Sequence, residues 1–206
     1  MIPGNDEFYA CPKCNQLHSK ATLMSGNTFG AKYYSDARVE YPYLPKFPNI
    51  TRCNNCREIF RLEKEISSLT YDEQNCDAAY FLDINGYKEA FLKVFYRNIE
   101  EELDLRFELL WKWHKMIEEE EMTAEEVYSD FYYLKNIDEI IPAIKDSDLG
   151  RILLVAELNR YAGRFEIAAE LFAPHLDETE FAIAKESYKR CLNKDRSVYI
   201  VNYQAV

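Results

Sequence analysis

The sequence predicts an α+β protein, in which a small β-rich module is followed by an acidic, all-α array of helical hairpins. Three observations support this prediction. Two Cys-x-x-Cys pairs lie near the start of the chain, and residues 1–62 are rich in proline, glycine and aromatic residues without helical periodicity. From residue 63, lysine and glutamate become frequent and proline almost vanishes. The expected domains are therefore residues 1–62 and residues 63–206, the second ending in a short extended tail.

The two cysteine pairs are the most specific motif. Cys11 and Cys14 form the first pair, and Cys53 and Cys56 form the second. Each pair supplies two thiolates from one tight turn, so two pairs complete a tetrahedral Zn²⁺ site. A rubredoxin-like iron site would use the same ligands, whereas a thiol redox site would need only one pair. A closed four-cysteine site has no open coordination position, so we expect the zinc to be structural.

Composition indicates a globular protein of the reducing cytoplasm. The 206 residues are 48% hydrophobic and 15% aromatic, which argues against disorder. The first residues contain no basic and apolar leader pattern, and no apolar run approaches the length that spans a membrane. In the cytoplasm, paired cysteines are expected to bind metal rather than form disulfides.

Charge is distributed unevenly along the chain. Residues 1–62 hold 8 basic and 5 acidic residues, a net +3, and the remainder holds 17 and 31, a net −14. Zinc with four thiolates would bring the first part to about +1. A concentrated basic surface for nucleic acid is therefore not evident. The nucleic-acid alternative depends on eight basic residues gathering on one face: Lys13, Lys20, Lys32, Arg38, Lys46, Arg52, Arg57 and Arg61.

The first domain is expected to contain turns and short strands. Asn15 and Arg57 follow the two cysteine pairs, where a left-handed backbone is often required, and a glycine would be easier than Arg57. The glycines of Ser25–Ala31, with Asp36 nearby, make this loop the best candidate for a ligand contact, although turn chemistry alone explains them. Residues 32–34 and 39–41 are expected to be strands.

Helices are expected in the second domain. Thr70–Glu73 and Thr123–Glu126 both have the spacing of a capping box, and Asn85-Gly86 indicates a turn before a helix over residues 87–96. Pro142 is expected to interrupt the helix that begins after Thr123. The other expected helices span residues 99–119, 152–161, 165–173 and 177–192, and residues 198–201 are expected to form a strand, docked on the first domain.

The cysteine pairs resemble those of a zinc ribbon, and this resemblance covers the first third of the chain. Gly163, Phe165, Ala168 and Phe172 resemble the centre of a tetratricopeptide-like helical hairpin, although no second copy with this spacing is found. The whole layout resembles uncharacterised bacterial proteins with an N-terminal zinc ribbon and a tetratricopeptide-like region. This resemblance implies an architecture and a bacterial source, but no activity.

Other residues of chemical interest have ordinary structural interpretations. Cys76 and Cys191 are expected to be buried thiols in helices, His18 a surface residue of the first domain, and His114 a hydrogen-bonded residue of the central helix. His175 is expected at a helix end. Motifs of zinc deaminases, phosphate loops, metalloproteases and serine hydrolases are absent.

Three functions follow from these observations, in decreasing order of support. The first is a non-enzymatic adaptor, whose acidic helices bind a protein or a basic peptide. The second is nucleic-acid binding through the first domain. The third is an enzyme whose site lies between the two domains.

Overall fold

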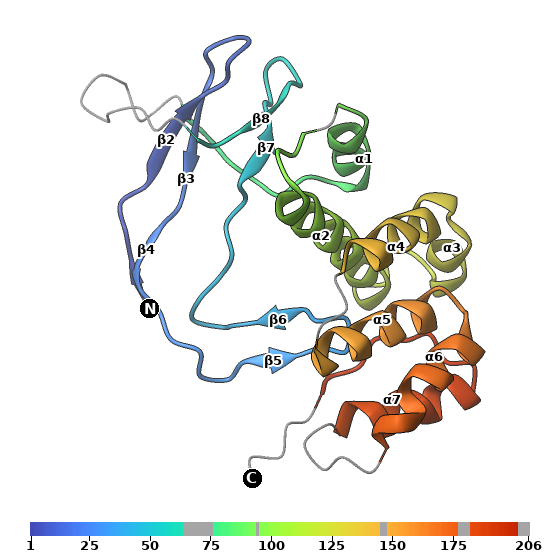
Figure 1. Ribbon diagram of the computed structural model, residues 1–206. Coiled ribbons are helices and arrows are strands. Elements are labelled where there is room, and N and C mark those ends of the chain that lie inside the picture. Colours follow the sequence, from blue (N-terminus) through green and yellow to red (C-terminus); the bar gives the residue numbers. More distant parts are fainter. Residues whose placement is uncertain (64–75, 94, 145–147, 177–181, 202–206) are drawn as a thin grey trace. The chain divides into compact units, whose positions relative to one another are not determined.

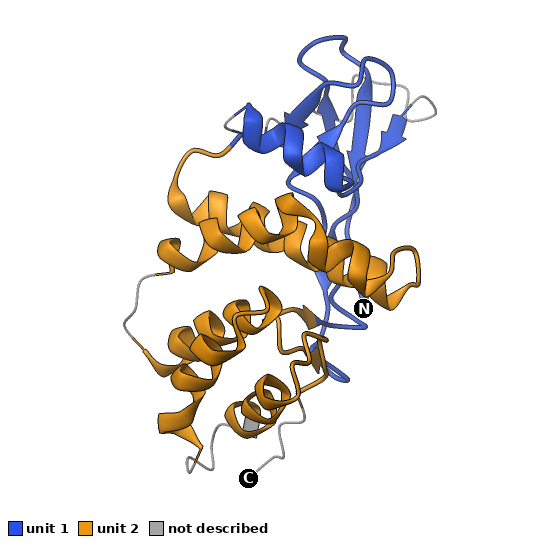
Figure 2. Cartoon of the chain, turned by 90° about the vertical axis from the view of Figure 1, so that its right-hand side faces the viewer, with its two compact units in different colours: residues 1–31, 40–95 blue, residues 32–39, 96–206 orange. Residues whose placement is uncertain are grey.

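The computed structural model describes residues 1–63, 76–93, 95–144, 148–176 and 182–201. The chain forms two compact units, coloured separately in Figure 2. Unit 1 comprises Met1–Ala31 and Glu40–Phe95, and unit 2 comprises Lys32–Val39 and Tyr96–Val206. These units differ from the expected domains, 1–62 and 63–206, because residues 32–39 are assigned to unit 2 and the residues from 63 to 95 to unit 1. The expected domains, as parts that fold independently, stay a prediction.

Small β-sheets dominate unit 1 (Figure 1). β1 pairs with β4, β7 pairs with β8, and β3 lies between β2 and β9 in a three-stranded sheet. The bounds of these strands are β1 Ile2–Pro3, β2 Glu7–Ala10, β3 Leu17–Lys20, β4 Leu23–Ser25, β7 Ile50–Arg52, β8 Ile59–Arg61 and β9 Cys76–Ala78. The β2–β3 and β7–β8 hairpins each carry one cysteine pair at the turn, so the hairpins determine the positions of the ligands.

Cys76 corrects one expectation, because it begins strand β9 instead of lying in a helix. Leu17 and Ser19 of β3 are in parallel register with Cys76 and Ala78 of β9. This pairing joins segments about 60 residues apart, and local helix propensity carries no information about it. The capping-box spacing at Thr70–Glu73 lies outside the described residues.

Helix α1 (Ile84–Leu92) begins earlier than expected, because Asn85-Gly86 is part of its first turn. The Asp83 side chain accepts a hydrogen bond from the Gly86 backbone N–H at 2.6 Å and so caps the helix. The turn signal of Asn-Gly is therefore overridden by an N-cap two residues before it.

Unit 2 is mainly helical. α2 coincides with the expected central helix except at its last residue, and the capping box of Thr123 and Glu126 at the start of α3 is confirmed. Pro142 does not interrupt α4, because it lies in the last helical turn, where little helix follows it. The helices are α2 Ile99–Glu118, α3 Ala124–Ser129, α4 Phe131–Ala143, α5 Leu149–Tyr161, α6 Phe165–Phe172 and α7 Ala182–Leu192, with a 3₁₀ turn η3 at Ala173–His175.

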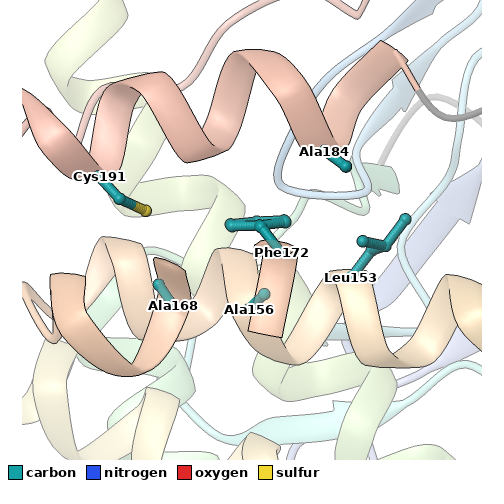
Figure 3. Close-up of a cluster of buried hydrophobic side chains, with 6 residues drawn as sticks. All are labelled: Leu153, Ala156, Ala168, Phe172, Ala184 and Cys191. Carbon is teal, nitrogen blue, oxygen red and sulfur yellow. The ribbon is translucent and has the colours of Figure 1, made fainter. Parts of the chain in front are cut away.

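The α5–α6 hairpin contains the glycine and aromatic residues that the sequence singled out. Gly163 has a φ of +78°, a conformation that L side chains rarely adopt, and it separates the two helices. Ala168 and Phe172 are fully buried, in one apolar cluster with residues of α5 and α7 (Figure 3). The cluster is Leu153, Ala156, Ala168, Phe172, Ala184 and Cys191, so the expected burial of Cys191 is confirmed.

A segment from between the two cysteine pairs belongs to unit 2. Strands β5 (Lys32–Tyr33) and β6 (Val39–Glu40) flank a tight turn, as expected for two short strands. The tail pairs with this turn within unit 2, because Tyr34 and Ile200 form an antiparallel bridge. The tail therefore pairs with residues 33–34, which lie within the expected first domain (1–62) but belong to unit 2 by their contacts.

Candidate metal centre

The two cysteine turns have the same backbone geometry. In the first, the Cys11 N–H donates to the Gln16 carbonyl and the Asn15 N–H to the Cys11 carbonyl, both at 2.9 Å. In the second, the Cys53 N–H donates to the Glu58 carbonyl at 2.8 Å and the Arg57 N–H to the Cys53 carbonyl at 2.9 Å. The hydrogen bonds therefore occur at equivalent positions, as expected for two turns built to hold the same ligand geometry.

Both turns require the left-handed conformation that their sequence positions predict. Asn15 has a φ of +60° and Arg57 a φ of +64°. Asparagine tolerates this region, whereas arginine loses about 1–2 kcal/mol in it. The second turn therefore stores a small strain that the surrounding contacts must offset.

The four sulfur atoms lie at the separations that a tetrahedral metal site needs. Cys11 Sγ is 3.5 Å from Cys56 Sγ, and Cys14 Sγ is 3.6 Å from Cys53 Sγ. All four sulfurs lie within 4.8 Å of one another. Zn–S bonds of about 2.3 Å give a tetrahedron with S···S edges of about 3.8 Å. The distances far exceed a disulfide bond of about 2.0 Å, so the four thiols are free and fit a metal ion.

Burial of the site is asymmetric. Cys11 and Cys53 are fully buried, whereas Cys14 and Cys56 are partly exposed. Burial raises the pKa of Cys11, and it raises that of Cys53 to about 12. The backbone N–H of Gln16 instead lowers the pKa of Cys14 to about 7. Burial thus disfavours the ionised form of the Cys11 and Cys53 thiols, and a bound metal ion would favour it.

The apolar cluster beneath the cysteines connects the two hairpins. Cys11 and Cys53 pack with Tyr9, Phe60 and Leu62 in one buried group. Tyr9 comes from β2 and Phe60 from β8, so the cluster carries side chains from both hairpins. The arrangement can hold a metal and stabilise the fold, but four protein sulfurs leave no coordination position for a substrate.

His18 lies in β3 and is fully buried, which corrects the expected surface position. Its ring packs edge-on against Phe60 at 5.1 Å between centroids. Among the described residues, neither ring nitrogen has a hydrogen-bond partner. Because His18 does not belong to the group of possible metal ligands, it is a core residue rather than a fifth ligand.

We expect His18→Leu to stabilise unit 1 by about 1 kcal/mol. The substitution replaces a buried polar ring that has no hydrogen-bond partner among the described residues. Burial lowers the pKa of His18, so the folded state disfavours its charged form. The wild-type protein should therefore lose stability as pH falls from about 6.5 toward the lowered pKa. Chemical unfolding of the metal-loaded proteins at pH 7.5 and pH 5.5 tests this. Equal pH dependence of the two proteins would contradict it.

The glycines of Ser25–Ala31 are explained by contacts within the chain. A Cβ on Gly26 would lie 2.5 Å from the Tyr43 carbonyl oxygen, so only glycine permits this approach of the backbone. Gly30 has a φ of +72° in a turn where the Ala31 N–H donates to the Thr28 carbonyl. Asp36, which follows this loop in the sequence, belongs to unit 2.

The eight basic residues do not all belong to one unit. Lys32 and Arg38 lie in unit 2, and Arg38 is buried. Within unit 1, Arg52 pairs with Glu89 at 2.8 Å and Lys13 with Glu58 at 3.7 Å. The charge that a nucleic-acid surface would need is thus divided between units and partly neutralised.

His114 has partners that sequence proximity did not indicate. Its Nδ1 lies 2.7 Å from a carboxylate oxygen of Asp36, and its Nε2 lies 3.1 Å from the Tyr133 hydroxyl. His114 is hydrogen-bonded, as expected, but Asp36 is 78 residues away in the sequence. No local signal could identify this pair. His175 ends the η3 turn, as expected for a residue at a helix end.

Comparisons of the chain with models of protein families, with curated proteins and with solved structures found no match. None of the described helices combines the length and the apolar character needed to cross a membrane. The chain is thus characterised by its own geometry: an α+β protein with a four-cysteine cluster that can hold a metal ion.

Proposed function

We propose that this chain is a non-enzymatic zinc-binding adaptor or scaffold protein of the cytoplasm. The observation that carries the proposal is the cluster of four cysteine sulfurs on two equivalent turns. Zinc is favoured over iron because a closed four-cysteine site suits a structural metal that has no redox chemistry. In this proposal, the two cysteine hairpins of unit 1 form a zinc-ribbon-like module whose metal is structural.

The proposed binding part is unit 2, whose α5–α6 hairpin has a buried alanine and phenylalanine at its centre, in the manner of a tetratricopeptide-like repeat. Arrays of helical hairpins present extended surfaces to protein partners. Residues 96–206 hold 14 basic and 24 acidic residues, a net −10, and residues 32–39 add +1. The resulting net charge of −9 on unit 2 favours a basic peptide or a basic protein surface.

The electrostatic part is tested with Glu119→Lys/Glu121→Lys, which reverses two exposed charges after α2. A partner recovered by affinity capture from a lysate treated with nuclease should bind this variant about 3- to 10-fold more weakly at low salt, because its long-range attraction falls. The difference should shrink at high salt. Lys189→Gln is the control, since it removes a positive charge from unit 2 and should not weaken the binding of a basic partner.

Capture that survives nuclease and weakens with salt supports the adaptor. Capture that disappears with nuclease would instead favour nucleic-acid binding. A partner whose affinity is the same for the charge-reversed and wild-type chains would contradict the basic-partner proposal.

A further inference from the structure

Residues 33–38, here called the inserted turn, form hydrogen bonds with side chains of α2 and α5 and with the backbone of the tail. The turn is closed by a hydrogen bond from the Tyr34 N–H to the Arg38 carbonyl at 2.9 Å, and Ala37 has a φ of +61°. The chain enters unit 2 before this turn and returns to unit 1 after it. The turn is thus a short loop whose contacts come mostly from residues after position 95.

The Asp36 side chain of the turn is hydrogen-bonded to His114. The Asp36 carboxylate lies 2.7 Å from His114 Nδ1, and both side chains are fully buried. Burial alone would raise the pKa of Asp36, but the hydrogen bond from His114 and the charge of nearby Arg38 hold it below its ordinary value. Asp36 is therefore ionised and accepts the Nδ1 proton, while the opposite ring nitrogen of His114 meets the Tyr133 hydroxyl.

The neighbouring positions of the turn are also recognised. The Ser35 hydroxyl lies 2.7 Å from the Tyr161 hydroxyl. Arg38 donates to both carboxylate oxygens of Glu118, one of them at 3.0 Å, and stacks 3.9 Å above the Tyr34 ring. A serine, an aspartate and an arginine thus each meet a different side chain of the α2–α5 region, which is the basis of sequence-specific recognition.

Backbone contacts complete the arrangement. The Trp111 indole N–H donates to the Asp36 carbonyl at 2.9 Å. The Ser35 N–H donates to the Tyr199 carbonyl at 2.9 Å, and the Val201 N–H donates to the Tyr33 carbonyl at 2.7 Å. Strand-like backbone pairing combined with side-chain recognition is the means by which many domains bind peptides.

We propose that unit 2 contains a recognition site for a Ser-Asp-x-Arg turn, and that the inserted turn fills this site within the same chain. A partner protein that presents a turn of this chemistry would bind by replacing it. This proposal rests on the adaptor function and specifies the partner: a loop in which aspartate meets His114 and arginine meets Glu118.

The inserted turn has an advantage over a free peptide in binding the site. A segment tethered to its own site has an effective concentration on the order of millimolar, so a free peptide at micromolar concentration competes poorly. A substitution that weakens the binding of the inserted turn should therefore make the site accessible to a free peptide. Asp36→Ala does this, because it removes the carboxylate from the turn and leaves the recognising residues His114, Tyr161 and Glu118 intact.

The test uses a fluorescently labelled peptide of residues 30–42 and the zinc-loaded full-length chain. Anisotropy should show the wild-type peptide binding the Asp36→Ala chain at least tenfold more tightly than the wild-type chain. A peptide carrying Asp36→Ala should bind neither chain. The matched control is a chain that carries both Asp36→Ala and His114→Ala. It should bind the wild-type peptide no more tightly than the wild-type chain does. A folded Asp36→Ala chain that binds the peptide no better than the wild type would overturn the proposal.

A second variant covers the case in which Asp36→Ala does not fold. Protease sites are placed at Phe29 and Tyr43, which are 78% and 50% exposed and lie on either side of the turn. After cleavage of the folded protein, the excised segment should remain bound and exchange with labelled peptide. Loss of the unit 2 helices on cleavage, or a segment that never exchanges, would show that the turn is only part of the core.

The results separate this inference from the adaptor function. A partner that binds the Asp36→Ala chain and is not displaced from it by the 30–42 peptide would refute turn recognition and leave the adaptor function standing. Peptide exchange without any captured partner would support turn recognition and count against the adaptor function.

Discussion

Cys53→Ser is expected to abolish metal binding and to unfold unit 1. The free energy of zinc binding in small four-ligand modules is about 10–16 kcal/mol at pH 7, which equals or exceeds the 5–15 kcal/mol stability of a typical domain. Here the buried sulfurs of Cys11 and Cys53 lie in the apolar cluster that connects the two hairpins. Without metal, the β2–β3 and β7–β8 hairpins would lose their main connection.

Metal analysis and NMR of the wild-type and variant proteins test this expectation. The wild type should contain one zinc per chain, and Cys53→Ser should contain none and lose the dispersed signals of unit 1. Unit 2 should keep its helices, since the described contacts of its inserted turn do not involve a metal ligand. Cys76→Ser is the matched control, because Cys76 lies in the same unit but outside the four-cysteine group. Wild-type protein that folds normally after complete removal of metal would contradict a structural metal.

The second large effect is expected for Arg160→Met in helix α5. Arg160 is fully buried and donates to the Glu157 carboxylate at 2.6 and 2.9 Å. It also donates to the carbonyls of Asp195 and Ser197 at 2.8 and 3.0 Å, which attaches the tail to the helices. Methionine would leave a buried carboxylate and two carbonyls without these donors, so we expect a loss of about 3–5 kcal/mol.

Chemical unfolding followed by circular dichroism measures this loss. Arg151→Met is the control in the same helix: its ion pair with Asp148 is exposed, so its removal should change stability by about 0.5 kcal/mol or less. Burial raises the pKa of Glu157 even beside Arg160. A raised carboxyl pKa costs stability as pH rises, so Arg160→Met should be more damaging at pH 8 than at pH 5. Equal losses for the two variants would contradict the importance of the buried pair.

Local signals in the sequence were sufficient for several features of the structure. The spacing of the cysteine pairs predicted two turns with matching geometry, including a left-handed residue after each. The capping box at Thr123 and the periodicity of residues 99–119 predicted two helices. These features depend on interactions among residues a few positions apart, and the sequence displays such interactions directly.

Where the sequence misled, a longer-range contact or a cap determined the outcome. Cys76 was expected in a helix, but its pairing with β3 makes it a strand residue. Asn85-Gly86 indicated a turn, but capping by Asp83 places both residues in α1. His18 was expected at the surface, but packing against Phe60 buries it.

The sequence by itself determined the four cysteines that can hold a metal ion, the α+β composition and the main helices of unit 2. Only the tertiary structure decided that residues 32–39 belong to unit 2, because the contacts responsible join distant positions. Asp36 meets His114 across 78 residues, and Ser35 meets Tyr161 across 126. Such pairs form when the folded chain excludes water from both partners, since each buried polar group then requires the other. No periodicity or motif encodes that requirement locally.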